Sequence, residues 1–279
     1  MKLEQIYEFK AGDDGILSII ANDNTLYSAG EDNFIRSFNL INFKQINEIK
    51  AHSKDILKII LSSCKNYIFS TSRDGFIKQW DLELNLIYEY PPHNSDVNSI
   101  DFIDEKYFIS GSDDGTIRIY KINSASYKEI KPNIGDINAL KVTSNYIYLG
   151  GSKLQILNKN FKLIKENDNY IYGINLIKQN ENLIYISTSM EKKLEVWDEE
   201  KLKPVKEIKL LNWINDIFFS DDMLFIAHGN VISILDKDLN TIYENDLHND
   251  EIYSILIYDS KLITASNDSY IRIWKFYTD

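Results

Sequence analysis

Apolar and polar residues alternate with a period of two along much of the chain, as in Val97–Phe102, and this pattern is typical of β-strands. Paired strands flank tight turns. In Ile68–Asp81 the turn Arg73-Asp74-Gly75 separates two short apolar runs, and glycine adopts the positive φ of such a turn at little cost. No segment keeps a helical period long enough to predict a helix. The pattern predicts an all-β protein built from hairpins.

The hairpin pattern recurs along the chain, which makes the repeat the basic unit of the fold. Related hairpins occupy Ser28–Asn39, Ser110–Lys121, Ser187–Asp198 and Thr264–Lys275. Shorter versions, at Gly150–Leu157 and Ala227–Leu235, lack the Asp and Trp of the others and predict blades with tighter turns.

Each hairpin follows a further strand that begins with an apolar anchor. These anchors are Ile16, Ile56, Val97, Ile137, Ile171, Ile214 and Ile252, spaced by 40, 41, 40, 34, 43 and 38 residues. A fourth, outer strand precedes the next anchor, at Phe43–Ile49, Leu86–Tyr90, Tyr127–Ile130, Lys162–Glu166, Val205–Ile208 and Thr241–Glu244. Seven units of about 40 residues predict a seven-bladed β-propeller of four-stranded antiparallel blades, forming one domain over residues 1–279.

The seventh unit ends after three strands. Leu3–Phe9 precedes the first anchor and belongs to no other unit, so we expect it to complete the last blade. A ring closed in this way has no free sheet edge between its first and last blades.

Composition narrows the possible functions. The net charge of −11 and the pI near 4.9 disfavour binding to nucleic acid. One cysteine, Cys64, cannot form an intramolecular disulfide, and no apolar run approaches the ~20 residues of a membrane span. We therefore expect a cytoplasmic protein without membrane insertion, monomeric on its own or a subunit of a complex.

These repeats resemble the WD-repeat family of seven-bladed propellers over the whole chain. The resemblance implies a network of His, Ser or Thr, Asp and Trp within a blade, which fixes strand register once all its polar groups are paired. The implied sets are His52, Ser70, Asp74 and Trp80 in unit two, His93, Ser110 and Asp114 with Tyr120 for Trp in unit three, and His248, Thr264, Asp268 and Trp274 in unit seven. Unit five keeps Ser187 and Trp197, with Glu191 for Asp and Asn167 for His.

Little in the sequence indicates catalysis. The histidines recur once per blade instead of converging, and no metalloprotease, Cys-x-x-Cys, phosphate-loop or nucleophile-elbow motif is present. Asp113-Asp114-Gly115 resembles only a fragment of a calcium loop. We expect no catalytic residue, metal or cofactor.

The remaining candidate is a binding surface. In the family the residues beside each anchor and before each turn Asp lie on one face, the top face. The strongest candidates by this alignment are Glu31, Asp55, Arg73, Asp96, Asp113, Asp136, Tyr170, Tyr172, Trp213, His228, Glu251 and Tyr253, and the wider set includes Gly15, Asn98 and Met190. Aromatic side chains are enriched at interaction hot spots, and carboxylates select Lys or Arg on a partner. The alternative is that these Asp residues cap turns and the Tyr residues pack between blades.

Three functions follow from these observations. The first is a non-catalytic scaffold that binds a basic and apolar protein or peptide on its top face. The second is an enzyme, or a metal or small-molecule binder, that uses the central channel. The third is an accessory subunit for assembly of a larger complex.

Overall fold

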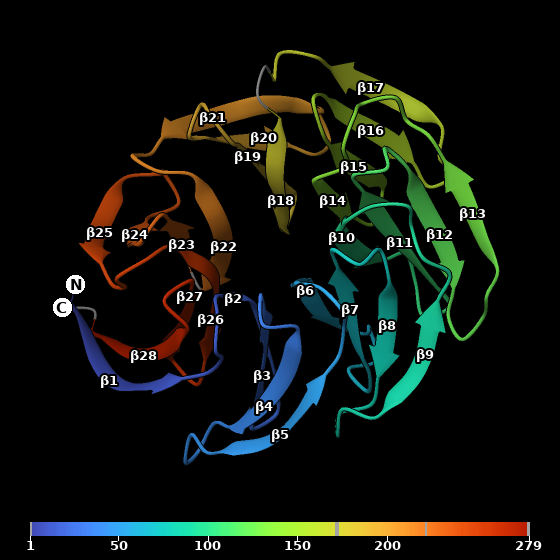
Figure 1. Ribbon diagram of the computed structural model, residues 1–279. Helices are drawn as coiled ribbons and strands as arrows, with labels where there is room; N and C mark the ends of the chain where they lie inside the picture. The colour runs from blue at the N-terminus through green and yellow to red at the C-terminus, as the bar shows by residue number, and fades with distance from the viewer. Residues whose placement is uncertain (1, 171–172, 221, 278–279) are drawn as a thin grey trace. The chain divides into compact units, whose positions relative to one another are not determined.

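The computed structural model describes residues 2–170, 173–220 and 222–277, and in this part of the chain it contains 28 β-strands and no helix. The strands form seven four-stranded sheets, each running in chain order from inner to outer strand except the last (Figure 1). The predicted fold class, all-β with seven four-stranded blades, is confirmed. The described residues accordingly offer no helix that could cross a membrane.

The chain divides into two compact units, Met1–Ile59 with Ile214–Asp279, and Ile60–Trp213. In the 1–59/214–279 unit, the first blade comprises β2 (Ile16–Asn22), β3 (Thr25–Gly30), β4 (Phe34–Asn39) and β5 (Gln45–Lys50). The sixth blade comprises β22 (Ile214–Ser220), β23 (Met223–His228), β24 (Val231–Leu235) and β25 (Thr241–Asp246). The seventh blade comprises β26 (Ile252–Tyr258), β27 (Lys261–Ser266), β28 (Tyr270–Tyr277) and β1 (Lys2–Lys10).

The 60–213 unit contains the remaining blades. The second has β6 (Ile56–Leu61), at the border of the units, then β7 (Ile68–Ser72), β8 (Ile77–Trp80) and β9 (Leu86–Tyr90). The third has β10 (Val97–Phe102), β11 (Tyr107–Ser112), β12 (Ile117–Lys121) and β13 (Tyr127–Ile130). The fourth has β14 (Ala139–Val142), β15 (Tyr146–Gly150), β16 (Leu154–Asn158) and β17 (Leu163–Asn167). The fifth has β18 (Ile174–Asn180), β19 (Leu183–Thr188), β20 (Lys193–Asp198) and β21 (Lys203–Lys209).

Burial accounts for the difference in residue types between the second strands and the outer strands of the blades. The second strand of a blade is mostly buried. In β15, for example, Ile147 and Leu149 pack with apolar residues of blade three and Tyr148 packs with those of blade five. Outer strands such as β5 are exposed throughout and carry polar residues. Ile109 and Ile117 of blade three share one core cluster with Leu140 and Leu149 of blade four. Within each unit the core therefore lies between successive blades.

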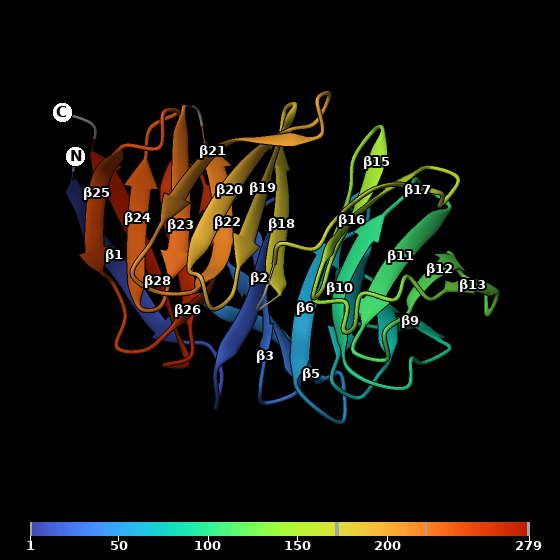
Figure 2. The same cartoon turned by 90° about the horizontal axis from the view of Figure 1, so that it is seen from above.

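The last blade is completed by the N-terminal strand, as predicted. β1 pairs antiparallel with β28, from Lys2 opposite Tyr277 to Lys10 opposite Tyr270 (Figures 1 and 2). Leu3 is the one buried side chain of β1 and joins a cluster that contains Trp274 and Phe225.

A β-bulge follows the anchor in five inner strands. The register shifts lie at Ile16/Ser18, Val97/Ser99, Ile174/Leu176, Ile214/Asp216 and Ile252/Ser254. The predicted anchor Ile171 lies outside the described residues, and the bulge shows that Ile174 occupies the anchor position of blade five. Ile174 is fully buried and stands 40 residues before Ile214, so the alignment of this blade moves by three residues.

Candidate functional site

The loops before the inner strands and the hairpin turns between second and third strands, together called the upper loops, form a connected series in the 60–213 unit. Backbone hydrogen bonds run Asp113 N to Asp96 O (3.0 Å), Ile137 N to Ser112 O (3.0 Å), Asn138 N to Gly150 O (2.9 Å), Ile174 N to Gly151 O (3.0 Å), Ser189 N to Gly173 O (3.2 Å) and Leu210 N to Lys192 O (2.9 Å). The upper loops of blades three, four and five therefore lie at one end of this unit.

Three of the predicted carboxylates are brought together in these loops. Burial raises the pKa of Asp113, and the negative charges of Asp136 and Asp96 raise it further, although hydrogen bonding by Asn98 and the charge of Arg73 act against them. Asn98, at the bulge of β10, donates from Nδ2 to Asp113 Oδ1. Arg73 Nε lies 3.7 Å from Asp96 Oδ2. One guanidinium beside three carboxylates leaves this group, called the acidic group, with net negative charge.

An apolar group lies in the same series of loops, in the turn between β19 and β20 of blade five and in the loop that follows β21. Its members are unusually exposed for large apolar side chains: Met190 55%, Leu211 70% and Trp213 47%. Lys192 Nζ donates to Leu211 O at 2.7 Å, which joins the loop carrying Leu211 and Trp213 to the turn carrying Met190. Sequence reasoning proposed Trp213 and Met190 but missed Leu211, although the run Leu210–Trp213 was its signal.

A second set of predicted residues meets in the other unit. Burial raises the pKa of Tyr253 to about 12, and the negative charges of Glu251 and Glu31 contribute to this increase. Gly15 permits this close packing, because a Cβ there would lie 2.9 Å from Glu31 Oε2 and 2.3 Å from Asn267 Oδ1. Asp55, also proposed, is partly buried.

Tyr170 and His228, both proposed as surface residues, are buried, and Tyr172 lies outside the described residues. Tyr170 donates from its hydroxyl to Glu195 Oε2 at 2.6 Å. It stands four residues before Ile174, just as His93 stands four residues before Val97, so it takes the histidine position of blade five. The prediction that Tyr170 faces a partner was wrong because the alignment of this blade was displaced by three residues.

Glu195 is the centre of the polar network in blade five. Trp197 Nε1 donates to Glu195 Oε2 at 2.8 Å, and Lys193 Nζ lies 2.7 Å from Oε1. Burial alone would raise the pKa of Glu195, but hydrogen bonds from Lys193, Tyr170 and Trp197 outweigh it and hold this pKa below its ordinary value. Ser187, expected in the network, instead donates to Asn175 Oδ1 at 2.8 Å.

His228 is also buried, at the end of β23, and not in an exposed turn. Its Nε2 lies 2.7 Å from Ser233 Oγ, and that hydroxyl donates to Glu244 Oε2 at 2.7 Å. Burial lowers the pKa of His228. This side chain is therefore part of the interior of blade six and not a surface contact.

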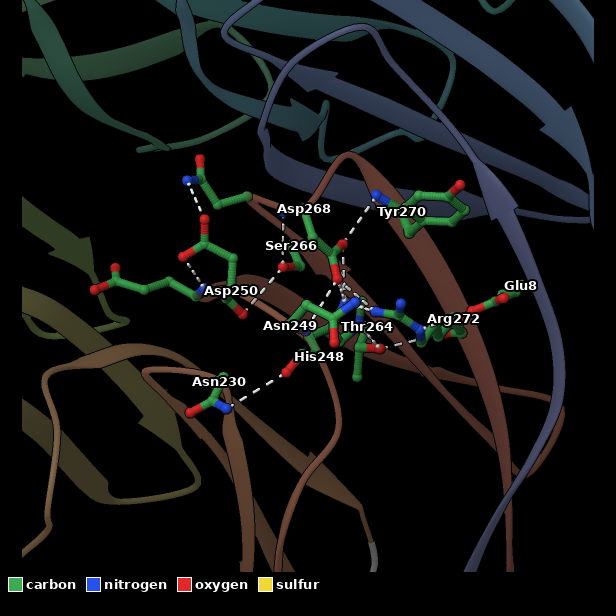
Figure 3. A network of polar contacts seen from close by, with 12 residues as sticks. Glu8, Asn230, His248, Asn249, Asp250, Thr264, Ser266, Asp268, Tyr270 and Arg272 are labelled. Carbon is green, nitrogen blue, oxygen red and sulfur yellow. Dashed lines mark hydrogen bonds and ion pairs between the residues drawn. The ribbon is translucent and has the colours of Figure 1, made fainter.

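The networks implied by the family resemblance are clearest in blade seven (Figure 3). His248 lies 3.0 Å from Asp268 Oδ2 through Nδ1 and 2.7 Å from Thr264 Oγ1 through Nε2, and Trp274 Nε1 donates to Thr264 Oγ1 at 2.9 Å. Arg272 adds ion pairs to Asp268 (2.6 Å) and to Glu8 of β1 (2.9 Å).

Blades two and three follow the same plan with local differences. His93 lies 3.0 Å from Asp114 and 2.7 Å from Ser110 Oγ, whereas the Tyr120 hydroxyl donates to Pro91 O. In blade two, Trp80 Nε1 donates to Ser70 Oγ at 2.9 Å, His52 is buried, and Asp74 accepts from Phe76 N.

The sequence analysis did not predict a row of glutamates on the outer strands, here called the glutamate ladder. At one register of each blade, a glutamate of the outer strand faces the third strand: Glu48, Glu89, Glu129, Glu166, Glu207, Glu244 and Glu8, opposite Arg36, Lys78, Arg118, Gln155, Glu195, Ser233 and Arg272. The signal was a Glu in each exposed outer strand. Four of these pairs are ion pairs, from 2.8 to 3.1 Å.

The part of the chain that the structure describes contains no candidate metal site. Among the described residues, no group of three or more His, Cys, Asp or Glu side chains could hold a metal ion.

Comparisons with known proteins agree with the fold. The family model described as WD domain, G-beta repeat matches residues 43–81, 84–121 and 239–275, the stretches that contain His52, His93 and His248. No curated protein matches the chain. Of solved structures, 1801 chains match, so the architecture is widespread. One is a crystal structure of the computationally designed Ika8 protein, with a TM-score of 0.76 and 14% identity, covering 98% of this chain and 99% of that chain. At this identity the likeness shows the fold alone.

Proposed function

We propose that this WD-repeat protein is a non-catalytic interaction scaffold, and that the upper loops of its 60–213 unit bind a protein segment with basic and apolar side chains. The family is commonly associated with protein interaction. The observation that carries the proposal is the occurrence of the acidic group and the apolar group in one hydrogen-bonded series of loops. Since the single cysteine suits a reducing compartment, we place this function in the cytoplasm.

The chemistry of the two groups defines the partner. Asp96, Asp113 and Asp136 supply an attraction for Lys or Arg that a single Arg73 only partly offsets. Trp213, Leu211 and Met190 supply apolar area that water otherwise covers, and burial of such side chains gives about 25 cal/mol per Å². Aromatic anchors of this kind commonly dominate binding energy.

A displayed library of random peptides, selected on the immobilised full chain, tests the proposal. Enriched peptides should combine Lys or Arg with aromatic or branched apolar residues. The variant Asp96→Asn/Asp113→Asn/Asp136→Asn should lose selection for the basic residues, and Leu211→Ala/Trp213→Ala should lose selection for the apolar ones.

A matched control neutralises three exposed carboxylates of the same unit outside the upper loops, as Glu105→Gln/Glu181→Gln/Glu200→Gln. This variant should select the same peptides as the unaltered chain. Enrichment that is indifferent to the acidic and apolar variants, or equally lost in the control, would refute the proposed surface. The idea of an accessory subunit differs only in the identity of the partner.

A further inference from the structure

The chain contains three Asp-Gly sequences, Asp14-Gly15, Asp74-Gly75 and Asp114-Gly115. Glycine leaves the preceding aspartate open to an intramolecular reaction, because the amide nitrogen that follows it is unhindered by a side chain. The reaction needs that nitrogen to reach the Asp side-chain carboxyl carbon. The structure therefore decides which of the three sequences can react.

Two of the glycine nitrogens are directed elsewhere. Gly75 N donates to Ser72 O at 3.2 Å and Gly115 N donates to Ser112 O at 3.1 Å, both in turns with positive φ. The aspartates are held as well. Asp74 Oδ1 accepts from Phe76 N, and Asp114 accepts from Thr116 N and Asn94 N.

Asp14 is arranged differently. Gly15 N donates to Oδ1 of Asp14 itself at 3.0 Å, which places the nitrogen next to the carboxyl group that it would attack. The Asp14 side chain is exposed, so water can enter and leave. Asp101, Asp216 and Asp250 also accept from the following amide, but the next residues are Phe102, Ile217 and Glu251, whose side chains hinder attack.

We infer that Asp14-Gly15 is a site of spontaneous isomerisation to isoaspartate, and thereby a substrate site for isoaspartate-specific carboxyl methylation. Gly15 N attacks Cγ of Asp14 and loses its proton, and the carboxylic acid loses its hydroxyl, so that one water leaves and a succinimide forms. Water then adds. Opening at the main-chain carbonyl gives isoaspartate, and opening at the side-chain carbonyl restores aspartate. No oxidant or other reactant is needed.

The position of this site gives the reaction a structural consequence. Isoaspartate inserts a methylene into the main chain just before Gly15. Gly15 O accepts from Glu31 N at 2.9 Å, and Gly15 has no room for additional atoms beside Glu31 and Asn267. Isomerisation therefore disturbs the packing that holds Glu31 near Tyr253 in the 1–59/214–279 unit.

The test follows isoaspartate at all three sequences in the full chain, incubated near neutral pH at 37 °C. Peptides are quantified by mass spectrometry with electron-transfer fragmentation, and by methyl transfer from S-adenosylmethionine with an isoaspartyl methyltransferase. We expect isoaspartate to accumulate several-fold faster at Asp14 than at Asp74 or Asp114. Equal rates, or a faster reaction at either turn, would overturn the inference.

Two controls separate structure from sequence. In urea, where the native contacts are lost, the three sequences should react at similar rates, and a retained preference for Asp14 would show that the folded geometry is not the cause. Asp14→Glu keeps the charge but would require a larger ring, so it should abolish the signal at this position while leaving the other two unchanged.

Discussion

At the scale of single residues, a buried polar network persists even where its usual members are absent. Blade five has neither the histidine nor the turn aspartate of blade seven, yet Tyr170 and Trp197 both donate hydrogen bonds to Glu195 Oε2. The constraint is physical, because a buried polar group without a partner costs about 1–3 kcal/mol. Different residue types can meet that constraint as long as each donor finds an acceptor.

Glu195→Gln tests this account. The change removes a largely buried negative charge that holds Lys193 and accepts from Tyr170 and Trp197, so we expect a loss of about 2–4 kcal/mol in the free energy of unfolding at pH 7. Urea titration followed by tryptophan fluorescence measures it. Glu191→Gln, at the position that sequence reasoning assigned to this network, should change stability by less than about 0.5 kcal/mol. A larger effect at Glu191 than at Glu195 would contradict the assignment.

Glu195 also shows where prediction from sequence failed. The family resemblance named residue types, and in blades three and seven those types suffice, since His93 and His248 lie against Asp114 and Asp268. In blade five the substitute acceptor, Glu195, lies on the third strand and outside the turn where an acid was sought. Similar chemistry can thus be supplied from a different element, and spacing alone does not reveal it.

At the scale of elements, five anchors were predicted to the residue, since an inner strand begins at each of Ile16, Ile56, Val97, Ile214 and Ile252. The outer strands Leu86–Tyr90 and Tyr127–Ile130 were predicted to the residue, since a short run between turn signals has few alternative bounds. The anchor of blade five was displaced because Tyr170–Ile177 is apolar at most positions, and such a run has several equally good starting points. Only the bulge between Ile174 and Leu176 fixes the register.

The last blade depends on β1, which has little side-chain burial of its own. Leu3 is 8% exposed and packs near Trp274, whereas Ile6 of the same strand is 42% exposed. Leu3→Ala should therefore cost about 2–3 kcal/mol, from lost burial and the cavity that remains. Hydrogen exchange should show faster exchange in β1 and β28 first, since β1 is held chiefly by its ladder to β28.

Ile6→Ala is the matched control for this strand. It removes a comparable apolar group from a more exposed position, so it should change stability by less than about 1 kcal/mol and leave exchange in β28 nearly unchanged. Equal effects of Leu3→Ala and Ile6→Ala would show that burial at Leu3 is not what holds the strand.

At the scale of the whole molecule, the repeat made the fold predictable while the partner remained a proposal. Seven copies of one strand pattern leave few alternative architectures, and averaging over copies corrects errors in any one of them. A binding surface has no such redundancy, because each blade contributes different residues, as Asp113 in blade three and Met190 in blade five illustrate. We therefore expect the proposed binding surface to depend on the positions at which the copies differ.

The buried histidines predict how the stability of the whole molecule responds to acid. Burial lowers the pKa of His93, His228 and His248, so in the native state they remain neutral at pH values where the unfolded chain takes up protons. Their contribution is complete above the ordinary pKa of about 6.5 and is lost as the pH falls below it. The pKa of Asp114 is lowered to about 2, although burial acts to raise it. The stability that Asp114 contributes is therefore lost only at a much lower pH than the contribution of the histidines.

We therefore expect the urea midpoint to be lower at pH 5 than at pH 8. The corresponding loss in the free energy of unfolding is at most about 2 kcal/mol per histidine. Asp113 has the opposite effect on stability, since a carboxyl group with a raised pKa favours the folded state more at low pH. Its effect is smaller than that of the three histidines because it is a single, partly buried group. The variant His93→Gln/His248→Gln should be less stable at pH 8 and should lose less on acidification, because fewer unfolded-state sites then take up protons. A midpoint that rises from pH 8 to pH 5, or an equal loss in the variant, would show that these histidines do not remain neutral in the native interior.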